Sequence, residues 1–251
     1  MILEWLIEFI LKKNKIKSYL YKKYKKVKDK TNDKVVNCSI INIDEIFPIN
    51  CQKSKIKFKR LNLLIPALSK QNVFGGISTA LIIFKSLLKE FDSGRIIITD
   101  EINFENNEDF FDWKIIKNTE RDFDGLTIIP FADRANKFLP VGESDFFIAT
   151  AWWTAYNALK IQNWQKEIFK IKNKFIYLIQ DYEPSFYNWS TRYALAESTY
   201  HFPDSYIPVF NSSLLKDYFY NENYKISNGL GFEPILNPEL KKLRKNNFKE
   251  V

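Results

Sequence analysis

The chain has 251 residues, 45% of them hydrophobic and 16% aromatic, so it can bury one substantial core and is not disordered. Its two cysteines and single histidine, His201, exclude a disulfide framework and disfavour zinc and multi-histidine metal sites. A reducing compartment is therefore expected. The formal net charge of +8 would suggest a nucleic-acid partner, but the charge is unevenly distributed along the chain.

Positive charge concentrates in residues 1–60, which we expect to form a basic, helical N-terminal arm. Residues 1–34 hold 11 lysines against four acidic residues, a net charge of +7. Residues 61–251 hold 22 basic and 24 acidic residues, a net charge of −2. The aromatic residues cluster in this nearly neutral part instead of alternating with basic ones, so no nucleic-acid partner is expected.

The arm begins with the apolar stretch MILEWLIEFIL. This stretch is too short to span a bilayer, which takes about 20 residues, and it lacks the charge and cleavage site of a signal peptide. A short hydrophobic helix followed by lysines and tyrosines suits docking on an anionic membrane surface through residues 1–34. A solvated basic helix whose apolar end packs on the domain or on a second subunit explains the pattern equally well.

From Leu61 onward, strand patterns alternate with helix patterns. Apolar runs predict buried strands at 61–67, 95–100, 126–131, 145–150, 174–180 and 205–210. Helical spacing predicts helices at 77–91, 152–170, about 185–199 and 212–220, the last with Asn211 or Ser212 as its N-cap. This alternation predicts an α/β fold with a Rossmann-like, doubly wound, mostly parallel sheet.

In such a sheet, ligands bind beyond the carboxyl ends of the strands, so the segments that follow the strands are candidate sites. The first candidate is Gly75, Gly76, Ile77 and Ser78, at the predicted start of a helix whose free amides suit a phosphate or diphosphate. The pattern is neither a dinucleotide-binding fingerprint nor a P-loop. A glycine turn that serves only close packing is the alternative.

A second candidate follows the strand at 145–150. Trp152 and Trp153 are adjacent and cannot both face the core from one turn of a helix, so one of them is expected to line the crevice or an interface. An aromatic face there would stack on a sugar, although packing in the core is the commoner use of a tryptophan.

A third candidate follows the strand at 174–180. Asp181 and Glu183 could orient or deprotonate a hydroxyl group, or they could cap the next helix and pair with Arg192. His201 lies before a strand rather than after one, which favours a structural role.

Four motifs in this order carry a resemblance to a known family: NLLIPALSKQNVFGGISTAL, FFIATAWWTAYNA, FIYLIQDYEPSFYNW and PVFNSSLLKDYF. Across about residues 60–235 the chain resembles the N-terminal half of the WsaF-like rhamnosyltransferases, which belong to glycosyltransferase family 4 and have the GT-B fold. The resemblance implies cytoplasmic synthesis of a bacterial surface polysaccharide, with a nucleotide sugar such as dTDP-rhamnose as donor and no metal. It also implies a saccharide acceptor, often lipid-carried.

The resemblance further implies roles for individual residues. Gly75 and Gly76, with Ile77 and Ser78, match the loop whose amides approach the donor diphosphate. Asp181 matches the acidic position expected to act on the acceptor as the catalytic residue. The expected neighbours in the acceptor site are Trp152, Trp153, Tyr182, Glu183 and Tyr187.

The family usually has a second domain with basic residues for the diphosphate and an E-x7-E pair. No glutamate in this sequence is followed by another eight positions later. We therefore expect an acceptor domain at 61–235, the start of an interdomain linker at 236–251, and a C-terminal donor domain supplied by a separate chain. A non-catalytic saccharide-binding or membrane-tethering module on the inner face of the membrane, or a truncated inactive fragment, are the alternatives.

Overall fold

The computed structural model describes residues 43–69, 75–102, 104, 108–226 and 228–233. The chain divides into two compact units, Met1–Ile43 and Asp44–Val251, and the fold below is that of the second unit. The expected helical arm over residues 1–42 and the expected linker over 236–251 lie outside the described residues.

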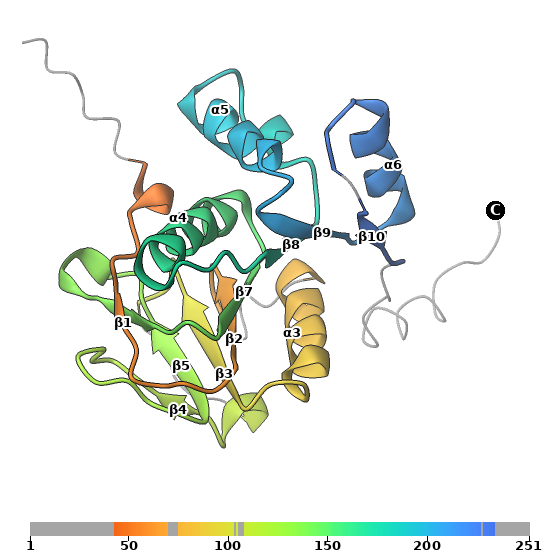
Figure 1. Cartoon of the computed structure of the whole chain (residues 1–251). Coiled ribbons are helices and arrows are strands. Elements are labelled where there is room, and N and C mark those ends of the chain that lie inside the picture. Colours follow the sequence, from red (N-terminus) through yellow and green to blue (C-terminus); the bar gives the residue numbers. More distant parts are fainter. Residues whose placement is uncertain (1–42, 70–74, 103, 105–107, 227, 234–251) are drawn as a thin grey trace, which may run out of the picture. The chain divides into compact units, whose positions relative to one another are not determined.

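Helices and strands alternate along the described chain (Figure 1). The helices are α3 (Gly75–Leu88), α4 (Trp152–Phe169), α5 (Thr191–Ser198) and α6 (Ser213–Asn221). Short 3-10 helices are η1 (Asp44–Ile46), η2 (Glu108–Phe110), η3 (Arg134–Asn136), η4 (Glu183–Phe186) and η5 (Thr199–His201). The strands are β1 (Cys51–Lys53), β2 (Arg60–Ile65), β3 (Ser93–Ile98), β4 (Lys114–Ile115), β5 (Leu126–Pro130), β6 (Leu139–Val141), β7 (Asp145–Ala149), β8 (Phe175–Ile179), β9 (Tyr206–Phe210) and β10 (Leu230–Gly231).

The main sheet has eight parallel strands in the order β10-β9-β8-β7-β2-β3-β5-β4. Strand β2 lies at the centre, paired with β3 on one side and with β7 on the other. The chain builds the sheet outward from β2 in both directions, so the order of strands reverses between β2 and β7. In open parallel sheets this reversal is where the crevice for a ligand opens.

Helices cover both faces of the sheet, as a parallel sheet requires (Figure 1). Helix α4 packs Ala155, Ala158 and Ile161 into the apolar cluster on one face. Helix α3 packs Ala80 and Phe84 into the cluster on the other face. Every residue of β2 is buried, and its four apolar residues pack on both faces of the sheet, whereas Arg60 and Asn62 are buried with hydrogen-bond partners. The predicted α/β fold is confirmed.

Each strand predicted from an apolar run is present, and so are the helices predicted after the glycine turn, after β7 and after β9. The predicted helix at about 185–199 is wrong in its first half. Residues 183–186 form only the short η4, which contains Pro184 near its start. Ser190 has an extended backbone, and its side-chain oxygen accepts from the Tyr193 amide, so α5 begins at Thr191. Helix α6 has the predicted N-cap Ser212, which accepts from the Leu215 amide.

The assignment of residues 44–60 to the arm is also wrong. Strand β1 pairs in parallel with β6, with Cys51 opposite Leu139, and Ile49 lies in the core. Arg60 is the first residue of β2. The polar, lysine-rich sequence of this stretch gives no local sign that it belongs to the domain, because β1 pairs with β6, which lies far along the chain.

A buried ion network lies at the amino ends of the central strands. Asp145 accepts from Arg60 at 2.7 Å and 2.8 Å, and Arg95 contacts the same carboxylate at 3.5 Å. Arg60 also donates to Asp122, and Arg95 donates to Asn62 at 2.6 Å. Both arginines have almost no exposed surface, so these bonds compensate their desolvation and join the first residues of β2 and β7.

Candidate functional site

The carboxyl ends of β2, β3, β7 and β8, with the segments that follow them, are called the carboxyl edge here. Three contacts tie these segments to one another: Gly76 with Gln180, Trp152 with Glu183, and Trp153 with Asp100. They connect the start of α3, the end of β3, the start of α4 and the end of β8. The structure therefore brings together the three segments that the sequence singles out.

The two glycines at the start of α3 differ in their surroundings. A Cβ atom added to Gly75 would meet nothing within 4 Å, whereas one added to Gly76 would lie 2.9 Å from Gln180 Oε1. Ile77 and Ser78 follow in the first turn and are half-buried. Gly76 therefore serves close packing, whereas the space beside Gly75, the first residue of α3, is open among the described residues.

Gln180 lies between the glycine turn and the end of β7. Its Nε2 donates weakly to the Thr150 carbonyl oxygen at 3.4 Å. Its Oε1 is buried and has no hydrogen-bond partner among the described residues. Unsatisfied buried acceptors are rare and concentrate where a ligand or a rearrangement completes the bonding. The unpaired acceptor lies beside Gly76, at the strand reversal.

Trp152 is fully buried and holds Glu183 and Tyr187 in place through hydrogen bonds. Its backbone amide donates to Glu183 Oε2 at 2.9 Å, and its indole Nε1 donates to the Tyr187 hydroxyl at 3.0 Å. The rings of Trp152 and Tyr187 meet edge to face, with centroids 6.3 Å apart. The expectation that Trp152 contacts an acceptor is therefore not met, because it has no surface to offer.

Glu183 is a buried carboxyl group at the N-terminus of α4, whose own N-cap position is Ala151. Burial raises the pKa of Glu183 to about 8. The hydrogen bond from the Trp152 amide opposes this shift, and the charge of Asp181 adds to it. Glu183 thus caps the preceding helix, α4, and not the following one. It does not pair with Arg192.

Trp153 is half-buried and directs its Nε1 to Asp100 Oδ2 at 2.9 Å. Burial raises the pKa of Asp100, and the hydrogen bonds from Thr99 and Trp153 oppose the shift. Asp100 was not among the sequence candidates. It directly follows β3, so the rule that polar residues after a strand point to a site would have found it.

Asp181 is exposed and follows β8 directly. Its Oδ1 accepts from the Tyr182 backbone amide at 2.8 Å, which fixes the orientation of the carboxylate. Its backbone carbonyl accepts from the Tyr200 hydroxyl at 3.4 Å. The carboxylate is therefore oriented by its own turn and stays accessible at the carboxyl edge.

Tyr182 points away from Trp152 and Trp153, into a cluster between α5 and α6. Its hydroxyl donates to Glu197 Oε2 at 2.7 Å, and Tyr224 donates to the other oxygen of Glu197 at 2.6 Å. Its ring packs against Tyr218 and Phe219. His201 lies 3.2 Å from Glu197 Oε1. Tyr182 therefore anchors the β8 turn, and its hydroxyl is not directed toward the crevice.

The segment around η1 is fastened at the carboxyl edge. The buried Arg134 donates to the Phe47 carbonyl at 2.9 Å and to the Thr99 carbonyl at 2.7 Å. Arg192 of α5 pairs with Glu45 at 3.0 Å. Arg192 therefore holds η1 against α5. The sequence had offered Asp181 and Glu183 as its partners.

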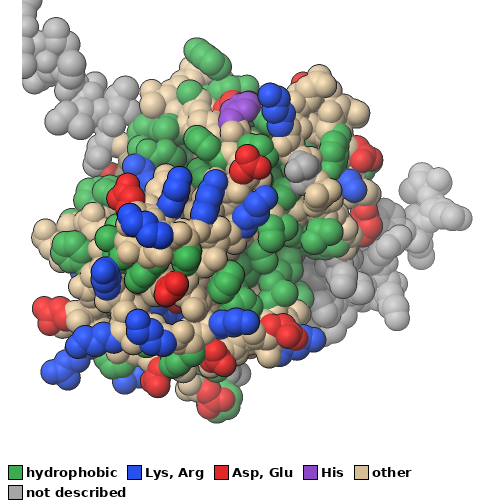
Figure 2. Space-filling view, viewed as in Figure 1, with side chains coloured by type: hydrophobic (Ala, Val, Ile, Leu, Met, Phe, Trp, Pro, Cys, Tyr) green, Lys and Arg blue, Asp and Glu red, His purple; other side chains and the backbone are tan. Residues whose placement is uncertain are grey.

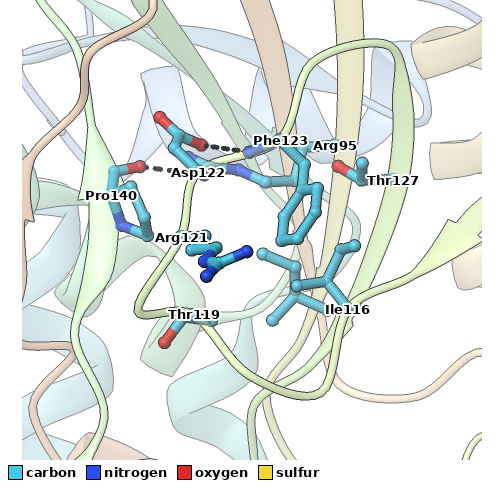
Figure 3. A pocket seen from close by; sticks show the side chains of 9 residues that line it. Arg95, Ile116, Thr119, Arg121, Asp122, Phe123, Thr127 and Pro140 are labelled. Atoms are coloured by element: carbon cyan, nitrogen blue, oxygen red, sulfur yellow. Dashed lines mark hydrogen bonds between the residues drawn. The ribbon is translucent and has the colours of Figure 1, made fainter.

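A small pocket lies elsewhere, near the amino ends of β3 and β5 (Figure 3). Its polar walls are largely paired within the ion network: Arg95 donates to the Pro140 carbonyl at 2.8 Å, and Asp122 accepts from Arg60 and from the Phe123 amide. This pocket shares no residue with the carboxyl edge. The lining residues are Arg95, Ile116, Thr119, Arg121, Asp122, Phe123, Thr127, Ile129 and Pro140.

Within the described ranges, no three or more His, Cys, Asp or Glu side chains gather in a way that would hold a metal ion. No helix in the same ranges is long and apolar enough to cross a bilayer.

The parallel order, the strand reversal and the polar residues beyond β7 and β8 define a Rossmann-like domain with its candidate site at the carboxyl edge. Residues 60–213, more than half of the chain, match the family model described as WsaF, N-terminal domain, so the chain belongs to this family. It therefore contains a glycosyltransferase domain, consistent with one Rossmann-like half of a GT-B fold. No curated protein matches the chain significantly.

Proposed function

We propose that this chain supplies the acceptor-binding half of a rhamnosyltransferase that acts in the synthesis of a bacterial surface polysaccharide. The donor would be a nucleotide sugar such as dTDP-rhamnose, the acceptor a saccharide carried on a lipid, and a second, C-terminal domain would hold most of the donor. Membership of the family supports the class of enzyme. The observation that supports the proposed acceptor site is the exposed and oriented carboxylate of Asp181 at the end of β8.

Asp181 has what a group that acts on an acceptor hydroxyl needs. It is exposed at the end of β8, and the Tyr182 amide occupies Oδ1. Oδ2 has no recorded hydrogen bond within the described part of the chain, so it can accept the proton of a sugar hydroxyl as that oxygen attacks the donor. Trp153, held by Asp100, would offer a ring face to the sugar beside it.

The glycine turn would serve the donor. A Cβ atom added to Gly75 would meet nothing within 4 Å in the described part of the chain, which would leave room for a diphosphate oxygen near the first amides of α3. These amides and the positive end of the helix dipole favour negative charge that develops on the leaving diphosphate. Gln180 Oε1, which has no hydrogen-bond partner among the described residues and lies beside Gly76, would accept from a ligand hydroxyl between the two half-sites.

The test is calorimetric titration of the full chain with a rhamnose oligosaccharide and, separately, with dTDP-rhamnose. We expect the oligosaccharide to bind and Asp181→Asn to weaken its binding about tenfold or more, because a hydrogen bond to a charged group contributes about 1.5–3 kcal/mol. Asp204→Asn is the matched control, since Asp204 is also exposed but precedes β9 at the opposite end of the sheet.

Two results would contradict the proposal. An Asp181→Asn chain that binds the oligosaccharide as well as the native chain does would remove Asp181 from the site. A native chain that binds neither ligand would favour a fragment with no ligand-binding role.

A further inference from the structure

Glu197 of α5 lies at the centre of a cluster of hydrogen bonds. The Tyr182 hydroxyl donates to its Oε2 at 2.7 Å, and the Tyr224 hydroxyl donates to its Oε1 at 2.6 Å. Hydrogen bonds to an ionised carboxylate are shorter and about twice as strong as those between neutral groups, and both distances lie in that short range. Glu197 therefore holds together two tyrosines that are 42 positions apart in the chain.

Two further side chains border this cluster. His201 Nε2 lies 3.2 Å from Glu197 Oε1, and the Tyr193 hydroxyl lies 3.4 Å from that of Tyr182. The His201 side chain is 60% exposed and reaches the surface (purple in Figure 2), whereas that of Glu197 is only 25% exposed. Both oxygens of Glu197 have partners inside the cluster, which favours a role in holding the protein's own groups over a role in binding a ligand.

Tyr182 connects the cluster to the candidate site. It directly follows Asp181, and its backbone amide donates to Asp181 Oδ1 at 2.8 Å. The other backbone bonds of Tyr182 are local, because its carbonyl accepts from the Ser185 amide at 3.1 Å and from the Ser185 hydroxyl at 2.8 Å. Local bonds shape the turn but do not fix it against the rest of the domain. The bond to Glu197, 15 positions along the chain, does so.

The rings around Tyr182 support the same placement. Its ring packs on that of Tyr218, with centroids 5.2 Å apart, and on that of Tyr200, with centroids 6.1 Å apart. The Tyr200 hydroxyl also donates to the Asp181 carbonyl at 3.4 Å. Apolar packing has no preferred direction, whereas a hydrogen bond requires both a distance and an angle. The bond to Glu197 therefore sets where the Tyr182 ring lies within the cluster.

We propose that Glu197 is a positioning residue for the acceptor. Through the Tyr182 hydroxyl it fixes the turn from which Asp181 presents its carboxylate to a saccharide hydroxyl. This inference rests on the proposed function of Asp181. Losing the bond leaves Asp181 chemically intact but lets its carboxylate leave the productive orientation. Acceptor binding then weakens although every group that contacts the acceptor is still present.

The first test needs no ligand and uses the full chain. Glu197→Gln leaves one acceptor oxygen and no charge for two tyrosine hydroxyls, so hydrogen exchange of the Tyr182 amide, followed by NMR, should become about threefold faster or more. Tyr182→Phe keeps the ring but removes the hydroxyl, and should have the same effect. Tyr218→Phe is the matched control, because its ring packs on Tyr182 but its hydroxyl makes no hydrogen bond within the described part of the chain.

The second test measures binding of the rhamnose oligosaccharide by calorimetry. Glu197→Gln should weaken binding about threefold, the low end of what one lost hydrogen bond produces. In a chain that already carries Asp181→Asn, it should weaken binding no further, because Glu197 acts only through Asp181. A general loss of structure would weaken binding in both backgrounds.

Unchanged exchange of the Tyr182 amide in Glu197→Gln and Tyr182→Phe would overturn the inference whether or not a saccharide binds. Faster exchange with unchanged binding would overturn the positioning role, and so would a loss of affinity that adds in full to that of Asp181→Asn. A native chain that binds no oligosaccharide would refute the proposed function, and the exchange measurement alone would then decide whether Glu197 orients the turn.

Discussion

Glu183 Oε2 accepts a hydrogen bond from the backbone amide of Trp152 at 2.9 Å. Glu183 belongs to η4, so it caps helix α4 from a different element of the chain. The N-cap position of α4 is Ala151, which has no side-chain oxygen. Thr154 accepts from the amides of Thr150 and Ala151, so Glu183 supplies the bond that the first helical amide needs. The hydrogen bond from the Trp152 amide and the positive end of the helix dipole thus offset part of the desolvation cost of the buried Glu183 carboxyl group.

Glu183 is expected to make the domain less stable as the pH rises. Its pKa is about 8 in the folded chain and near 4.5 when unfolded, so between these values the folded state binds the proton more tightly. The free energy of unfolding therefore falls from pH 5 to pH 8. Glu183→Gln keeps an acceptor for the Trp152 amide but cannot ionise. Urea unfolding across this range should show a smaller decline for the variant.

The exposed Glu167 of α4 provides the control, since Glu167→Gln makes the same chemical change without burial. It should leave the pH profile unchanged. If native chain and Glu183→Gln lose stability in parallel between pH 5 and pH 8, Glu183 is not the group responsible.

The two glycines of α3 should respond differently to alanine. Gly76→Ala places a Cβ atom 2.9 Å from Gln180 Oε1, so the amide must shift and its bond to Thr150 is lost, at a cost of about 1 kcal/mol. Gly75→Ala enters open space and should change stability by less than about 0.5 kcal/mol. Thermal unfolding of both variants decides this. Equal effects would contradict the packing role of Gly76.

Asp145 should be indispensable for stability. Burial alone would raise its pKa, but the hydrogen bond from Arg60 and the charges of both arginines outweigh burial and lower it. Asp145→Asn leaves two buried guanidinium groups without this carboxylate, which costs about 3–5 kcal/mol. Asp133→Asn, which breaks the partly exposed pair with Lys137, should cost less than about 1 kcal/mol. Denaturant titration measures both, and comparable losses would refute the argument.

Tyr187→Phe tests the hydrogen bond between the Trp152 indole and the Tyr187 hydroxyl at the carboxyl edge. The substitution leaves the indole N–H of the buried Trp152 without its acceptor, a loss of about 1–2 kcal/mol. Near-ultraviolet circular dichroism should report the altered environment of the tryptophan. Tyr156→Phe is the control. Tyr156 lies on α4 and is half-buried, as Tyr187 is, but its hydroxyl makes no hydrogen bond within the described part of the chain. A spectrum identical to that of the native chain would contradict the role of Tyr187.

The candidate site could be located from the sequence only in part. The rule that residues after parallel strands meet at one edge identifies Gly75, Trp153 and Asp181 as residues of this edge. It does not say that Trp152 is fully buried or that the Tyr182 hydroxyl binds Glu197. Those outcomes depend on the direction in which each turn leaves its strand, which the packing of α4, α5 and α6 decides.

The sequence by itself determined the strands and most of the helices of this domain, because a buried parallel strand needs a continuous apolar run and a helix needs apolar residues at its own spacing. Only the tertiary structure decided the partners of the charged groups. Glu183 meets Trp152 across 31 positions, Arg60 meets Asp145 across 85, and Arg192 meets Glu45 across 147. A polar side chain carries no local mark of its partner, since the partner is set by which strands become neighbours when the core closes.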